Sequence, residues 1–134
     1  MDPVNTSKNV TIKFPFLLVS RWILSGVLVG IGAWRVFTLI MNWSYWNERI
    51  VIDAAYSPIP WLAVECCVVV VGLLLAIRSK WVFVPLLAHI ALFARQLYVG
   101  LGDSPPPSMA YAIWAAELTV FAYCAWLWLE RKLK

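Results

Sequence analysis

The chain alternates between long apolar runs and short polar segments, and this pattern occurs four times. The apolar runs cover about residues 14–41, 60–77, 81–101 and 108–129. Each run is long enough to cross the roughly 30 Å hydrocarbon core of a bilayer as an α-helix, which rises about 1.5 Å per residue. The sequence therefore predicts an all-α integral membrane protein, in which residues 1–134 form a single domain, a four-helix transmembrane bundle.

The connections between these runs differ in length and character. Arg78-Ser79-Lys80 separates the second run from the third and predicts a tight antiparallel hairpin. The first connection, residues 42–60, is longer and contains Trp, Ile and Val among its polar residues. This composition favours a short helix that lies in the membrane interface, or a cap over one mouth of the bundle.

The basic residues between the apolar runs and near their ends predict the orientation of the chain. One set of segments holds eight of them: Lys8, Lys13, Arg21, Arg78, Lys80, Arg131, Lys132 and Lys134. The two connections on the other side hold only Arg49. Because cytoplasmic segments carry the excess of Lys and Arg, we expect both termini in the cytoplasm and the protein in the bacterial inner (plasma) membrane.

Composition supports a membrane location and argues against nucleic acid as a partner. The chain is 63% hydrophobic and 13% charged, against roughly 45–50% and about 25% in soluble domains. The basic residues behind the net charge of +4 form no patch with stacking aromatics between them, so the expected partner is the lipid bilayer. Several of the nine Trp are expected to act as interfacial anchors, namely Trp43, Trp46, Trp61 and Trp81.

Each apolar run contains an ionisable residue, and these four residues are Arg35, Glu65, Arg95 and Glu117. A charge at the centre of a membrane helix costs roughly 2.5–3.5 kcal/mol, so such residues usually pair or line a site. Counted from the helix ends, all four fall in the same half of the membrane. We expect Arg35 to pair with Glu65 and Arg95 with Glu117, because neighbours in sequence are usually neighbours in space. An exchange of partners across the bundle stays open.

This buried charge cluster has three interpretations. In the first, the Arg–Glu pairs serve only to fix the register of the helices, since polar residues often join membrane helices. Alternatively, the cluster lines a cavity for a proton, an ion or a small anion. In the third interpretation, one or more of the charges contacts a neighbouring subunit.

Two further sets of residues in the apolar runs are candidates for specific roles. His89 and Gln96 are seven residues apart and share a helix face, where His89 is a packing residue, a proton relay, a quinone contact or a haem ligand. We expect no cofactor, because a haem with two His ligands needs a second His that the chain lacks. Gly26, Gly30 and Ala33 form a stripe of small residues that favours close packing of another helix.

The three cysteines do not point to a metal site. Cys66 and Cys67 are adjacent, Cys124 is isolated, and none has the spacing of a Cys/His metal site. We expect them to act as small apolar residues within helices. Because the sequence also contains no nucleotide-binding or nucleophile motif, we expect no enzymatic activity.

The second half of the chain contains a combination of features found together in one known family. These are Glu65, the segment Ile90-Ala91-Leu92-Phe93-Ala94-Arg95, the Ser104-Pro105 break, and a Trp-bearing last helix that ends in Glu130-Arg131-Lys132-Leu133-Lys134. In these features the chain resembles the phosphate-starvation-inducible PsiE-type membrane proteins. The resemblance implies a small inner-membrane protein with four helices.

Three functions are compatible with these observations. The expected one is a non-enzymatic accessory or structural subunit of a larger inner-membrane complex, which is held by buried Arg–Glu pairs. Its expected partners are other membrane subunits or copies of itself. The second is a small homo-oligomeric transporter or channel with a coupling site at Glu65 and Glu117. The third is a redox subunit that contacts haem or a quinone through His89.

Overall fold

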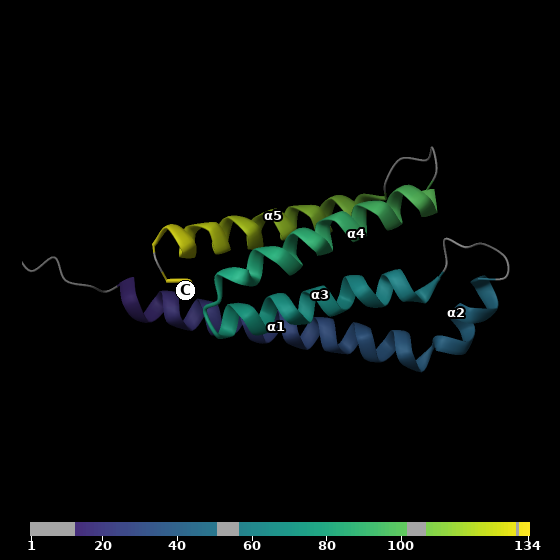
Figure 1. The fold of residues 1–134 in the computed structure, drawn as a ribbon, viewed down its shortest axis with the longest axis horizontal. Helices are drawn as coiled ribbons and strands as arrows, with labels where there is room; N and C mark the ends of the chain where they lie inside the picture. Colours follow the sequence, from purple (N-terminus) through teal and green to yellow (C-terminus); the bar gives the residue numbers. More distant parts are fainter. Residues whose placement is uncertain (1–12, 51–56, 102–106, 131) are drawn as a thin grey trace, which may run out of the picture.

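The computed structural model describes residues 13–50, 57–101, 107–130 and 132–134. In chain order, its elements are α1 (Lys13–Met41), α2 (Trp43–Ile50), α3 (Pro58–Ala76), the 3₁₀ helix η2 (Lys80–Val82), α4 (Phe83–Leu101) and α5 (Ser108–Leu129), as shown in Figure 1. Every regular element in these ranges is helical. Four of the helical segments are long and apolar enough to cross a membrane: Val19–Met41, Pro58–Ala76, Lys80–Val99 and Ser108–Leu129. The predicted all-α class with four long apolar helices is therefore confirmed.

The short helix α2 occupies part of the connection in which the sequence predicts one. Its position at a membrane interface or as a cap stays a prediction, as does the orientation of the bundle. Residues 51–56 of the same connection, the break at 102–106 and the basic residues Lys8 and Arg131 lie outside the described part of the chain.

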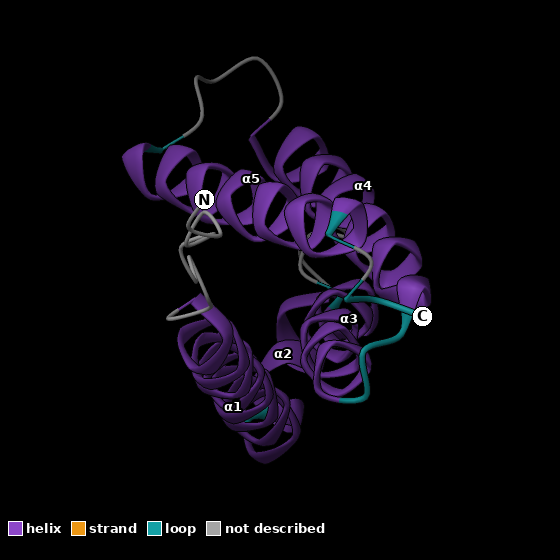
Figure 2. Cartoon of the chain, turned by 90° about the vertical axis from the view of Figure 1, so that its left-hand side faces the viewer, coloured by secondary structure: helices purple, strands orange, loops and turns teal. Residues whose placement is uncertain are grey.

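Helix α3 lies in the middle of the helix arrangement. It packs against α1 on one side and α4 on another, and α4 packs against α5; Figure 2, which looks along the helices, shows α3 between α1 and the α4–α5 pair. The helix starts with Pro58, whose missing N–H costs nothing in a first turn. Its sequence is apolar on nearly every side, as expected of a helix that is contacted from two directions.

The main hydrophobic core lies at the end of the bundle opposite α2. It is formed by Val71, Leu75, Val82, Leu86, Cys124, Leu127 and Leu133. Leu133 reaches this core because the segment after α5 turns back against the link between α3 and η2. Two backbone hydrogen bonds hold it there, from Lys80 N–H to the Lys134 carbonyl (2.8 Å) and from Lys134 N–H to the Arg78 carbonyl (2.7 Å).

Helices α1 and α3 approach each other closely at two glycines, Gly32 and Gly72. A Cβ at Gly32 would lie 2.8 Å from Val69 Cγ2, and one at Gly72 would lie 2.8 Å from Val29 Cγ2. Helices with such small residues at the contact bring their backbones together, which increases van der Waals contact.

The stripe of small residues predicted on the first helix does not make this contact. Gly26, Gly30 and Ala33 are exposed, and a Cβ at either glycine would meet no described atom within 4 Å. No described helix of the same chain therefore packs closely on the two glycines of the stripe. The face of α1 that meets α3 is rotated away from the stripe and carries Ser25, Val29 and Gly32 instead. A contact of the stripe with another chain stays a prediction.

Candidate functional site

Arg35 of α1 and Glu65 of α3 form an ion pair inside the bundle. Nη1 of Arg35 lies 3.0 Å from Oε1 of Glu65. The two ends of the pair are in different surroundings, because the Glu65 side chain is only 6% exposed whereas that of Arg35 is 50% exposed. The pair that the sequence predicts at this position is therefore present, and it joins the two helices that pack most closely.

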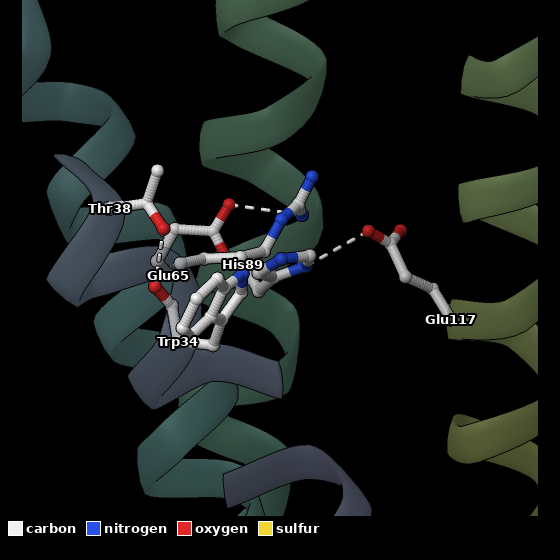
Figure 3. A network of polar contacts seen from close by, with 6 residues as sticks. Trp34, Thr38, Glu65, His89 and Glu117 are labelled. Atoms are coloured by element: carbon white, nitrogen blue, oxygen red, sulfur yellow. Dashed lines mark hydrogen bonds and ion pairs between the residues drawn. The ribbon is translucent and has the colours of Figure 1, made fainter. Parts of the chain in front are cut away.

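Glu117 of α5 contacts His89 of α4, not Arg95. His89 Nδ1 lies 2.9 Å from Glu117 Oε1, and the two side chains are 10% and 8% exposed. In Figure 3, Glu117 extends from α5 toward His89, and a dashed line joins the two side chains. The predicted Arg95–Glu117 pair is wrong: Arg95 is exposed, and its Nη1 donates to Oε1 of Gln96 at 3.3 Å.

The geometry of an α-helix explains this exchange of partners. Successive side chains on a helix are separated by about 100°, so residues seven positions apart share a face whereas residues six apart do not. His89 and Gln96 are both buried, at 8% and 6% exposure, which confirms that they share the inner face of α4. Arg95 is six positions after His89 and is turned out of the bundle.

Among the residues that the structure describes, each of these two carboxyl groups has one oxygen without a hydrogen-bond partner. These atoms are Oε2 of Glu65 and Oε1 of Glu117, both of which are buried. His89 touches Glu117 Oε1, but the contact does not have the geometry of a hydrogen bond. Buried polar atoms are nearly always hydrogen-bonded. Glu65 Oε2, which has neither a hydrogen bond nor an ion pair among the described residues, is therefore unusual in a folded protein.

Two cavities adjoin the Arg35–Glu65 pair. The larger, of about 630 Å³, lies among α1, α2 and α3, and its lining includes Trp34, Thr38, Asn42 and Tyr45. The smaller, of about 210 Å³, reaches α4 and α5, and its lining includes His89, Phe93 and Leu97. Three residues line both cavities, namely Arg35, Trp61 and Glu65. The ion pair therefore stands at the boundary between the two spaces.

Aromatic side chains form one wall beside the smaller cavity. Phe93 is at the centre of this group: it stacks on His89 with ring centroids 6.2 Å apart, and it makes edge-to-face contacts with Trp61 (6.2 Å) and Trp114 (6.5 Å). Tyr111 extends the group through an edge-to-face contact with Trp114. Such arrangements hold aromatic rings in fixed orientations.

Sequence reasoning singled out Trp61 as an interfacial anchor but did not find this aromatic wall. Trp61 lines both cavities, a position that only the packing of α3 against α4 reveals. One part of the wall was predictable from the sequence. Phe93 is four residues after His89, and this spacing places both side chains on the same helix face. The anchor roles of Trp43 and Trp81 stay predictions; Trp81 is 65% exposed, and the side chain of Trp46 lies outside the described part.

The cysteines are separate from this site. Cys66 is exposed, Cys67 is partly buried, and Cys124 belongs to the hydrophobic core at the other end of the bundle. The burial of Cys124 agrees with its predicted role as a small apolar residue.

Comparisons with protein-family models, with curated proteins and with solved structures gave no match to this chain. The resemblance to the PsiE-type proteins therefore stays a prediction, and the function has to be inferred from the site itself. Its components are two buried carboxyl groups, of which that of Glu65 has a free acceptor oxygen, together with a guanidinium, an imidazole and two adjoining cavities. This arrangement can exchange protons or bind a ligand that donates hydrogen bonds.

Proposed function

We propose that this chain is a small membrane transport protein in which Glu65 and Glu117 form the coupling site. The observation that carries the proposal is the placement of Glu65: its carboxyl group lies between two cavities, is 6% exposed, and has one oxygen paired with Arg35 and the other free. The proposal involves no catalysis by the chain and places it in the bacterial inner membrane with both termini in the cytoplasm.

The free oxygen of Glu65 supports transport over a purely structural role. Ion pairs that only join membrane helices are stabilised when all their polar atoms are satisfied, because an unsatisfied group in a low-dielectric interior costs free energy. Intramembrane carboxyl groups that are retained despite this cost usually belong to substrate or proton pathways. A carboxyl group with a free oxygen beside a cavity has the means to take up a proton or a cation and release it.

Flux measurements on reconstituted protein test the proposal. The full chain in liposomes is expected to move protons, or a solute driven by a proton gradient, faster than empty liposomes do. Glu65→Gln and Glu117→Gln are each expected to abolish this flux without lowering expression. Glu130→Gln is the matched control, because Glu130 is exposed at the end of α5. Flux that is unchanged in both cluster variants, or absent from the wild-type protein, would overturn the proposal.

A second candidate function, an accessory subunit of a larger membrane complex, is favoured by one observation. Arg95 lies within a segment that is apolar enough to cross a membrane, yet its side chain is exposed on the outside of the bundle. A guanidinium in this position is best satisfied by an acidic group of a neighbouring subunit or of a second copy of this chain.

Extraction in mild detergent tests this second function. If the chain is an accessory subunit, it is expected to purify with other subunits in a fixed stoichiometry, and Arg95→Gln is expected to weaken that association. A chain that purifies alone and monodisperse would argue against the accessory role. No specific observation favours the redox function, since His89 is engaged by Phe93 and Glu117.

A further inference from the structure

The four ionisable groups at the centre of the bundle do not balance in charge. They are Arg35 from α1, Glu65 from α3, His89 from α4 and Glu117 from α5. With both carboxyl groups ionised and His89 neutral, the cluster has one guanidinium for two carboxylates. An isolated charge is strongly disfavoured in a low-dielectric interior, so this cluster needs one additional positive charge, either a proton or a bound cation.

The free oxygen of Glu65 requires a cation that donates a hydrogen bond. Because Arg35 occupies Oε1, the remaining acceptor is Oε2, which has no hydrogen-bond partner among the described residues. A free carboxylate oxygen binds a hydrogen-bond donor. Among small molecules at neutral pH, protonated amines are the strongest donors, because their N–H groups carry a positive charge. A metal cation is less suited, since it needs several oxygen ligands and the smaller cavity is lined mainly by apolar side chains.

The aromatic wall favours a ligand whose uncharged part is apolar or aromatic. Trp61 and Phe93 both line the smaller cavity, and their edge-to-face contact fixes their rings beside Glu65. Aromatic faces attract cations and also bury apolar groups. A cavity of about 210 Å³ accommodates a molecule of the size of phenethylamine.

We infer that the smaller cavity binds a protonated organic amine with an apolar or aromatic body, its ammonium group donating to Oε2 of Glu65 and its body lying against Trp61 and Phe93. This inference deepens the proposed function and rests on it for the role of the bound amine. A proton and the amine supply the same single positive charge to the cluster, so each excludes the other. Before the amine binds, the balancing proton is held by the His89–Glu117 contact. Binding of the ammonium group releases that proton to water, which is the elementary step of exchange.

Binding of phenethylamine to the purified full chain tests the inference. Its neutral analogue 2-phenylethanol, the small cation methylammonium and the anion phenylacetate are the comparison ligands, and Trp fluorescence and calorimetry are the readouts. We expect phenethylamine to bind more tightly than all three. In Glu65→Gln its affinity is expected to fall about tenfold to a hundredfold, the effect of losing one charge-assisted hydrogen bond. Glu130→Gln, the exposed control, is expected to bind as the wild-type protein does.

Several results would overturn the inference. They are equal affinity for phenethylamine and 2-phenylethanol, tighter binding of phenylacetate, or undiminished binding in Glu65→Gln. If Glu65→Gln does not fold, the release of a proton by the wild-type protein in weakly buffered solution takes its place; we expect phenethylamine to release a proton and 2-phenylethanol not to. The absence of that release would contradict the exchange.

The same preparation separates this inference from the proposed function. Proton flux that depends on Glu65 without any binding of phenethylamine would leave transport standing and reject the amine. Binding without flux would retain the amine site and reject transport. If neither occurs, both proposals fail.

Discussion

Ser25 and Gly72 join α1 and α3 at a point where the two backbones nearly touch. Ser25 Oγ donates a hydrogen bond to the Gly72 carbonyl at 2.7 Å, and a Cβ added to Gly72 would lie 3.0 Å from the Ser25 carbonyl oxygen. The hydrogen bond is buried. A buried hydrogen bond and a close backbone contact therefore occur at the same position. Together they hold α1, which carries Arg35, against α3, which carries Glu65.

The first prediction concerns this contact. Gly72→Ala is expected to destabilise the protein by about 1–3 kcal/mol, because its Cβ would press on the backbone of α1, at Val29 N as well as the Ser25 carbonyl. Gly30→Ala is the control, since Gly30 faces open space and alanine favours a helix by up to about 1 kcal/mol over glycine. Thermal unfolding in detergent, followed by circular dichroism, should give shifts of opposite sign. Equal shifts would contradict the close approach.

The second prediction concerns the pairing within the charge cluster. A double-mutant cycle of Arg35→Gln and Glu65→Gln is expected to give a coupling energy of about 0.6–1.7 kcal/mol, the range for polar contacts between membrane helices. The same cycle for Arg95→Gln and Glu117→Gln is expected to give a value near zero, because these two residues do not pair. Reversible unfolding in mixed micelles provides the four stabilities of each cycle. A larger coupling for the second pair would disprove the partner exchange.

The third prediction concerns the turn after α3. Arg78 has a positive φ of 61°, and the backbone hydrogen bonds from Ser79 to Leu74 and from Arg78 to Leu75 form the pattern of a Schellman motif. Glycine is the residue that adopts this conformation without steric cost, so Arg78→Gly is expected to stabilise the protein by about 1 kcal/mol.

The comparison for this variant is Ala76→Gly within the last turn of α3, which is expected to lose about 1 kcal/mol. The two glycine substitutions, only two positions apart, should therefore shift the unfolding temperature in opposite directions. A decrease for both would show that the Arg78 side chain outweighs its backbone strain.

The fourth prediction concerns the segment after α5. Leu133 is 6% exposed and packs in the hydrophobic core, so Leu133→Ala is expected to cost about 2–5 kcal/mol. Leu129→Ala removes the same atoms from a side chain that is 72% exposed, and its effect in detergent is expected to stay within about 0.5 kcal/mol. Denaturation in detergent measures both. Similar small losses would mean that the tail does not dock on the core.

Much of the fold was predictable because it depends on local properties of the sequence. The four long helices follow from apolar runs of sufficient length, and every observed end lies within two residues of the expected one. The short helix at Trp43–Ile50 and the shared face of His89 and Gln96 also follow from local composition and helical spacing. The Arg35–Glu65 pair could be predicted from the sequence, because two consecutive long helices usually lie side by side.

The tertiary structure decided which face of each helix meets which neighbour. Helices α3 and α5 are apolar on nearly every side, so their sequences do not determine their rotation about their own axes. The rotation of each helix depends on all the neighbouring side chains at once. In the folded chain, Glu117 of α5 contacts His89, and Arg95 of α4 is exposed. Helices α1 and α3 meet at Gly32 and Gly72, and not at Gly26 or Gly30. The sequence alone determined how many apolar helices there are and which of their residues are polar. Only packing between helices decided which of those polar residues share one site.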